Sequence, residues 1–138
     1  MSSAAERVGW VREGWRALDL GEPDAALEFL DAEIEIHSAP SVGNPGTFHG
    51  HDGWRSWTGQ WFDAWESFDQ EVLTIEAVGD RCAIAKVHQV ARGRAAGVEI
   101  ERDVVYVYEL RDGKVIYMGL FADRDAALEA AATREADG

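Results

Sequence analysis

Residues 98–121 read VEIERDVVYVYELRDGKVIYMGLF and contain two runs of strand-forming residues on either side of one short break. Both runs are rich in Val, Ile and Tyr, which favour β-strands. The Asp112-Gly113 pair between them is typical of a two-residue hairpin turn. This stretch therefore predicts two antiparallel strands, over residues 98–110 and 114–121.

The residues before this hairpin repeat the same pattern. Residues 68–78 and 82–92 are two further runs, separated by Gly79-Asp80, and residues 93–97 form the next break. Because these connections are short, consecutive runs should be antiparallel neighbours. The sequence thus predicts a curved antiparallel sheet that contains a meander of four strands.

A tryptophan-rich helix is expected upstream of the meander. Trp54, Trp57, Trp61 and Trp65 follow Asp52 at helical spacing. One face of this helix would be almost entirely aromatic and must pack against other apolar groups. Core packing is the default role of such side chains, but aromatic surface of this extent also lines ligand pockets.

The N-terminal part predicts two helices, a strand and a loop. Ser3 and Glu6 stand at capping-box spacing, so the first helix should begin there. A short second helix should follow Pro23 and include Leu30. Residues 32–37 alternate apolar and polar, which predicts a strand, and the Pro- and Gly-rich residues 39–50 predict a loop with the length of a lid.

The chain should close with a short helix from Arg124 to about Ala132, with Asp123 as its N-cap. The predicted fold class is α+β, with the sheet wrapped around the N-terminal and central helices. The length of 138 residues predicts a single domain over residues 1–138. Val105 and Val107 would lie on the face opposite Tyr106, where we expect a homodimer to form through the sheet.

The charge balance excludes some partners. The chain has 13 Lys and Arg against 26 Asp and Glu, a formal net charge of −13, so a phosphate backbone would be repelled. We expect no binding to nucleic acid or membrane. The sequence shows neither a long apolar run nor a targeting segment, and Cys82 is the only cysteine. We therefore expect a cytoplasmic protein in which Cys82 is buried and unpaired.

Several stretches resemble the SnoaL-like proteins of the nuclear transport factor two-like superfamily. They are GHDGWRSWTGQW at 50–61, AVGDRCAIAKV at 77–87 and ELRDGKVIYMGLFADRDAALEAA at 109–131, with DLGEPDAALEFLDAEIEIH at 19–37 upstream. The resemblance implies a bent sheet that forms a cone-shaped pocket with its helices. Members of the superfamily include polyketide cyclases, ketosteroid isomerase and limonene epoxide hydrolase, so the fold does not fix the reaction.

Two of these chemistries do not carry over directly. The tyrosine and aspartate positions of ketosteroid isomerases correspond to Gly14 and Ile36, unless His37 acts as the base after a one-residue shift. The Asp-Arg-Asp relay of limonene epoxide hydrolases needs two of its groups on one strand face. Here Arg102 and Asp103 are adjacent and should point to opposite faces.

SnoaL-type polyketide cyclases need only one acid/base group in an apolar pocket, which leaves three catalytic candidates: His37, His88 and Asp123. Each has a structural alternative. His37 shares the polar side of its strand, and Asp123 is a helix cap. His88 shares strand parity with Ile84 and Val90, so it is expected in apolar surroundings as a structural histidine.

The candidate ligand-binding side chains are aromatic: Trp15, Trp54, Trp57, Trp61, Tyr106 and Phe121. His49 and His51 lack a third ligand at a suitable spacing, so we expect no metal and no cofactor. Together with the resemblance, these residues favour a cofactor-independent cyclase or isomerase. It would act by proton transfer on a small hydrophobic aromatic or polycyclic carbonyl compound. The alternatives are a non-catalytic ligand-binding protein and a dimeric interaction domain.

Overall fold

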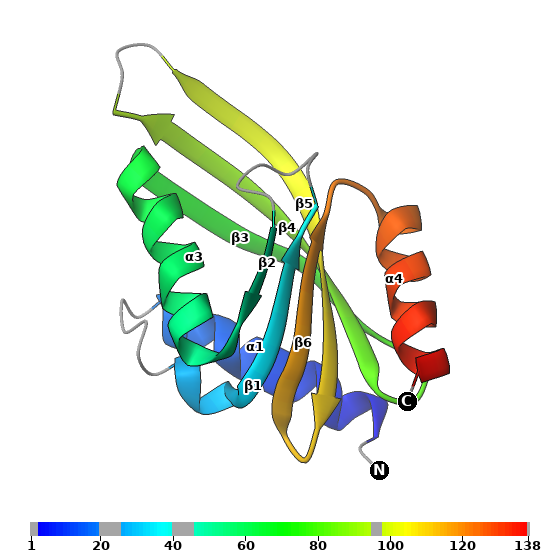
Figure 1. Ribbon diagram of the computed structural model, residues 1–138. Coiled ribbons are helices and arrows are strands. Elements are labelled where there is room, and N and C mark those ends of the chain that lie inside the picture. The colour runs from blue at the N-terminus through cyan, green and yellow to red at the C-terminus, as the bar shows by residue number, and fades with distance from the viewer. Residues whose placement is uncertain (1–2, 20–25, 40–45, 95–97, 138) are drawn as a thin grey trace.

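The computed structural model describes residues 3–19, 26–39, 46–94 and 98–137, and of residues 18, 19, 61, 62, 64 and 137 it describes only the backbone. The six strands and three α-helices of these residues confirm the predicted α+β class (Figure 1). In chain order the elements are α1 (Ala4–Asp19), a 3-10 turn η1 (Leu27–Phe29), β1 (Leu30–Ser38), β2 (Gly46–His49), α3 (Gly50–Ala64), β3 (Trp65–Val78), β4 (Cys82–Gly93), β5 (Glu99–Arg111), β6 (Lys114–Phe121) and α4 (Arg124–Asp137).

The six strands form one sheet in the order β2-β1-β6-β5-β4-β3. The meander from β3 to β6 is antiparallel throughout, as predicted. β1 departs from the predicted antiparallel sheet, because it runs parallel to β6, with Ile36 opposite Met118. Short connections predict only pairs of consecutive strands, whereas this pair joins strands that are far apart in the chain.

The hairpin turn between β5 and β6 has the expected geometry. Asp112 and Gly113 have φ of 53° and 77°, so both central residues are left-handed, as a type I′ turn requires. The pairing of β3 with β4 shifts register between Trp65 and Ser67, and that of β5 with β6 shifts beside Leu110. Such irregularities bend strands and explain the curvature of the sheet.

Helices cover both faces of the sheet. α1 and α3 lie on one face, here called the inner face, and α4 lies on the other, the outer face (Figure 1). Val105 and Val107 are buried on the outer face against Ala127 and Ala131 of α4. These two valines are therefore covered by the chain itself, which corrects their prediction as a dimer surface. An apolar sheet face shows that a cover is needed but not which segment supplies it; a homodimer through another part of the sheet stays a prediction.

Local signals placed most of the element ends correctly. Ser3 and Glu6 form the predicted capping box, with Ser3 N donating to Glu6 Oε1 and Glu6 N to Ser3 Oγ, both over 3.1 Å. Several boundaries differ: the described part of the second helix is the 3-10 turn η1, Leu30 and Trp65 each open a strand instead of belonging to a helix, and α4 extends to Asp137. Tertiary packing decided these ends, because both residues suit either state.

Part of the predicted loop over residues 39–50 is a strand. β2 covers residues 46–49 and pairs antiparallel with β1. The predicted helical residues 20–25 and the predicted loop residues 40–45 lie outside the described part of the chain. Within the described part, no helix has the length and apolar character needed to cross a membrane.

Candidate functional site

The inner face gathers four of the predicted ligand-binding aromatics. Trp15 of α1, Trp54 and Trp57 of α3, and Tyr106 of β5 are at most 7% exposed and belong to one core. Trp15 meets Tyr106 edge to face, with ring centroids 5.1 Å apart, and Tyr106 stacks on Tyr108 at 6.0 Å. The side chain of Trp61 lies outside the described part. The apolar stripes of α1 and α3 therefore converge on the Tyr side of β5.

A chain of polar side chains crosses this aromatic interior. Gln70, Gln89 and Arg102 lie side by side on β3, β4 and β5. Arg102 Nε donates to Gln89 Oε1 over 3.0 Å, and Gln89 Nε2 donates to Gln70 Oε1 over 2.9 Å. The Tyr106 hydroxyl also donates to Gln70 Oε1, over 2.9 Å. We call these four residues the inner polar chain.

Neither glutamine of the inner polar chain was predicted as a site residue. Gln89 is 1% exposed, although glutamine is mostly a surface residue. The sequence did contain a signal for Gln89, because this residue lies on the same face of β4 as the apolar Val87 and Ala91. A polar residue at a core position of a strand indicates a buried hydrogen-bond network.

Burial sets the electrostatics of the inner face. It raises the pKa of both Tyr106 and Tyr108, and it lowers the pKa of Arg102. The indole Nε1 of Trp15 is buried and makes no hydrogen bond of normal geometry to any described residue. It is nevertheless close enough to the Tyr108 hydroxyl to lower the pKa of that phenol, although burial raises the same pKa by more. The interior is thus rich in hydrogen-bond donors.

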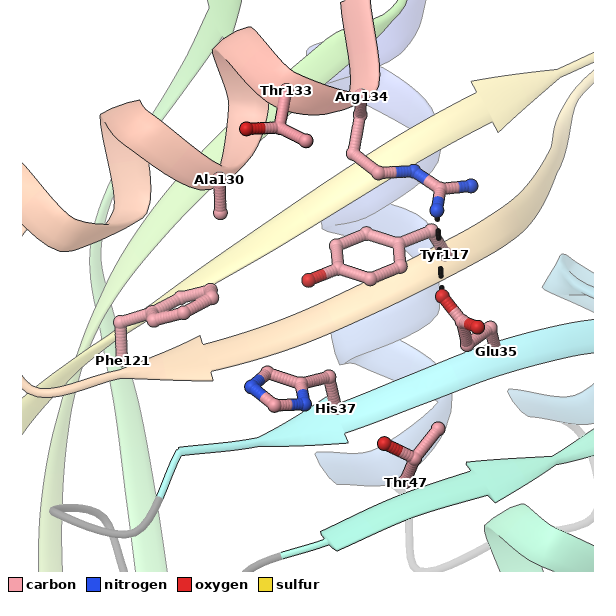
Figure 2. Close-up of a pocket in the computed structure, with 8 residues that line it drawn as sticks. All are labelled: Glu35, His37, Thr47, Tyr117, Phe121, Ala130, Thr133 and Arg134. Atoms are coloured by element: carbon pink, nitrogen blue, oxygen red, sulfur yellow. Dashed lines mark hydrogen bonds and ion pairs between the residues drawn. The ribbon is translucent and has the colours of Figure 1, made fainter. Parts of the chain in front are cut away.

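A cleft opens on the outer face, between α4 and the strands β1, β2 and β6. It has a volume of about 360 Å³ and is open to solvent. Figure 2 shows the side chains that line this outer cleft. They are Glu35, His37, Thr47, Tyr117, Phe121, Ala130, Thr133 and Arg134.

Aromatic and charged groups divide the outer cleft into two ends. The His37 and Phe121 rings lie with centroids 6.0 Å apart and planes tilted by 42°. At the other end, Arg134 lies over the Tyr117 ring at 4.4 Å and approaches Glu35 with an N–O distance of 3.3 Å. Burial raises the pKa of the Tyr117 phenol. The Tyr117 hydroxyl points from the charged end toward the aromatic end (Figure 2).

The predicted residues are thus split between two faces of the sheet. Phe121, a ligand-binding candidate like the tryptophans, lies apart from them in the outer cleft with His37. It points to the outer face because it stands one residue after Leu120, whose side chain is on the inner face. Since a sheet separates them, His37 cannot reach a ligand held by Trp15 and Tyr106.

The other two catalytic candidates have structural partners. Asp123 caps α4, with its Oδ1 accepting from Ala126 N over 2.9 Å, and it is exposed. His88 was expected in apolar surroundings, but it lies on the outer face between Asp103 and Glu101, at 2.7 and 3.0 Å. The prediction failed because β4 and β5 extend beyond α4 at this point, so strand parity no longer means burial. The hydrogen bond to Asp103 is the main reason that the pKa of His88 is raised.

The H-x-H pair does not converge on a site in the described structure. His49 is exposed on β2, whereas the Nε2 atom of His51 lies 2.9 Å from the Leu30 carbonyl oxygen. Across the described residues, no group of three potential metal-ligating side chains occurs. Cys82 is buried as predicted, and burial raises the pKa of its thiol to about 12.

Comparison with known proteins identifies the family. Residues 11–118 match the SnoaL-like domain, which is most of the chain. The chain belongs to the SnoaL-like domain family. The expectation drawn from the four quoted stretches is therefore confirmed at the level of family and fold, and the chain belongs to the NTF2-like superfamily. No functionally curated protein matches the sequence significantly.

Solved structures with the same SnoaL-like fold share little sequence with this chain. An NTF2-like protein from Burkholderia thailandensis is 18% identical, with a TM-score of 0.77 over 96% of this chain and 98% of that one. A candidate SnoaL-like polyketide cyclase from Jannaschia sp. CCS1 is 19% identical, with a TM-score of 0.71 over 96% and 94%. The epoxide hydrolase/cyclase-like enzyme SalBIII, with a role in pyran ring formation in the polyether salinomycin, is 18% identical, with a TM-score of 0.71 over 88% and 93%.

Proposed function

We propose that this SnoaL-like domain binds a small hydrophobic aromatic or polycyclic carbonyl compound on the inner face of its sheet and activates the carbonyl group. The observation that carries this proposal is the inner polar chain, which sets a guanidinium and a phenol within an aromatic interior. Aromatic side chains supply most of the binding surface for such a ligand. The few polar groups among them would fix its orientation.

Donors on the inner face suit a carbonyl oxygen. Arg102 is a fixed cation whose fork of N–H groups suits an oxygen acceptor, and Trp15 Nε1 is a buried donor that makes no hydrogen bond of normal geometry, although it lies near the Tyr108 hydroxyl. A buried donor left unsatisfied costs about 1–3 kcal/mol, so a ligand oxygen at this place would be favoured. Hydrogen bonds to the oxygen stabilise the enolate that forms when an adjacent carbon loses a proton.

The inner face offers groups that can polarise a carbonyl, but its described residues offer no group suited to remove a proton. Among the buried side chains described on the inner face, none is an Asp, a Glu or a His. We therefore assign to Arg102 the role of polarising the carbonyl, and we do not assign a base to the inner face. A polyketide carries acidic carbon atoms of its own, so its cyclisation makes modest demands on a base. The names of two structural neighbours, a candidate polyketide cyclase and a cyclase-like enzyme, favour ring closure as the reaction.

Binding is tested with 2-acetylnaphthalene, an aromatic ketone, and with 2-ethylnaphthalene, which lacks the oxygen. Calorimetric titration should show tighter binding of the ketone. Arg102→Met keeps an unbranched apolar stem and removes the cation, so it should weaken ketone binding roughly five-fold, as one lost hydrogen bond does, and leave hydrocarbon binding unchanged. Arg92→Met is the matched control, since Arg92 is exposed and pairs with Glu99 on the outer face.

Equal ketone affinity in the wild type and in Arg102→Met would refute the assigned role of Arg102. Catalysis is tested with the same ketone in D₂O, where activation of the carbonyl accelerates deuterium uptake by the acetyl methyl group. Faster uptake with the wild type than with Arg102→Met, followed by proton NMR, supports an enzyme of the cyclase or isomerase kind. Binding without faster uptake supports the alternative, a non-catalytic ligand-binding protein.

A further inference from the structure

We propose that the outer cleft is a second ligand-binding site, which takes a neutral single-ring aromatic molecule that carries a hydroxyl group. It lies across the sheet from the inner polar chain and does not depend on the function proposed for that face. Phe121 and the α4 residues of the cleft also lie beyond residues 11–118, the segment that matches the SnoaL-like domain.

Two polar side chains face the outer cleft without a hydrogen-bond partner among the described residues. Tyr117 is only 6% exposed, yet its hydroxyl makes no hydrogen bond to the described part of the protein. The ring nitrogens of His37 make none to described residues either, and the ring contacts Phe121 instead. Both groups turn toward the space between them and Phe121 (Figure 2). His37 is half-buried, whereas the Tyr117 side chain is almost fully buried. Polar groups on buried side chains are normally paired, so the unpaired phenol indicates a place for a ligand.

Gly119 makes room for this arrangement. A Cβ atom at Gly119 would stand 2.6 Å from the Tyr117 hydroxyl oxygen and 2.7 Å from Cε2 of Phe121, closer than atoms can approach. Gly119 is also the register partner of His37 in the parallel pair of β1 and β6. The phenol, the imidazole and the phenyl ring therefore surround a stretch of bare backbone. Only a glycine here lets the Tyr117 hydroxyl and the Phe121 ring pack directly against the backbone of β6.

The lining chemistry selects the class of ligand. Phe121 and Ala130 provide an apolar wall for a ring. The phenol of Tyr117 and a neutral imidazole can each donate and accept one hydrogen bond, which complements a hydroxyl group that does both. Arg134 is already held by Glu109 at 2.7 Å and by Glu35 at 3.3 Å, so its charge is balanced. With a net charge of −13 on the chain, an anion is disfavoured as well.

The test is a titration of the isotope-labelled full chain with phenol, followed by the amide signal of Gly119 and the imidazole signals of His37. We expect saturable shifts at these two residues with a dissociation constant in the millimolar range, as a ligand of this size allows. Toluene, which lacks the hydroxyl, and benzoate, which is an anion, should each bind at least roughly five-fold more weakly.

Two variants separate this site from the inner face. Tyr117→Phe removes only the unpaired hydroxyl and should weaken phenol binding roughly five-fold, while it leaves the binding of 2-acetylnaphthalene unchanged. Gly119→Ala should abolish phenol binding because its methyl group would displace the Tyr117 hydroxyl and the Phe121 ring. Gly59→Ala is its matched control, because a Cβ atom at Gly59 of α3 meets nothing within 4 Å.

Three results would overturn the proposal. One is the absence of saturable shifts at Gly119 and His37 up to the solubility limit of phenol. Another is phenol binding of full strength to Tyr117→Phe, which alone would decide the case if Gly119→Ala failed to fold. The third is a set of phenol shifts confined to the inner face, at Trp15 and Tyr106.

Discussion

Replacing Glu109 by glutamine should loosen α4 from the sheet. Glu109 of β5 is 3% exposed, accepts a hydrogen bond from Arg134 and forms an ion pair with Arg81. Its Oε1 lies 2.7 Å from Arg134 Nε on α4, and its Oε2 lies 3.4 Å from Arg81 Nε beside the β3–β4 turn. Glutamine has the same shape but presents an amide N–H₂ group to one arginine, where only an acceptor fits.

The magnitude follows from the burial of the three side chains. Removing one partner of a buried ion pair costs about 3–5 kcal/mol. Both arginines here are more than a quarter exposed, and each keeps another carboxylate, Glu35 for Arg134 and Glu135 for Arg81. The expected loss in the free energy of unfolding is therefore smaller, about 2 kcal/mol. For a chain of this length that corresponds to a fall in melting temperature of roughly 6–10 °C.

The assay is thermal and urea unfolding followed by circular dichroism. The same substitution at Glu99, also on β5, is the matched control, because Glu99 forms an exposed pair with Arg92 at 3.6 Å. Glu99→Gln should leave the melting temperature unchanged. If Glu109→Gln unfolds at the same temperature as the wild type, the ion pairs do not hold α4 in place, and the reasoning from burial is wrong.

Two further predictions concern titratable groups. The pKa of His88, measured from its imidazole NMR signals, should lie above the ordinary value, chiefly because of Asp103, and should fall in Asp103→Asn. Since the folded pKa is raised, the stability that His88 contributes is complete below the unfolded pKa of about 6.5 and is lost as pH rises through the folded value; a His88→Gln variant whose stability differs from wild type equally at all pH values would contradict this. Cys82, with its pKa raised to about 12 by burial, should react with a thiol reagent at pH 8 only after unfolding, and rapid labelling of the folded chain would refute its burial.

Much of the fold could be predicted because its signals are local. The left-handed turn at Asp112-Gly113, the cap at Asp123 and the alternation around Ile34 and Ile36 each depend on a few neighbouring residues. Such signals fix where an element begins and which of its faces is apolar. They failed where one residue suited two states, as with Trp65.

The candidate site was predicted only in part. The sequence singled out the aromatic residues Trp15, Trp54 and Tyr106, and the structure brings them together. The sequence alone could not predict the hydrogen bond between Gln70 and Gln89, because their contact depends on the register of two strands. Side-chain contacts across strands are set by register, which a single strand does not encode.

By itself, the amino-acid sequence determined the class of the fold, the family and the meander of β3 to β6. Only the tertiary structure placed β1 parallel to β6, covered Val107 with α4, and put His37 and Phe121 together on the face opposite the tryptophans. The physical reason is the range of the interactions. Turns and caps are hydrogen bonds between near neighbours, whereas the cover of a sheet face is chosen by the apolar area that distant segments bury together.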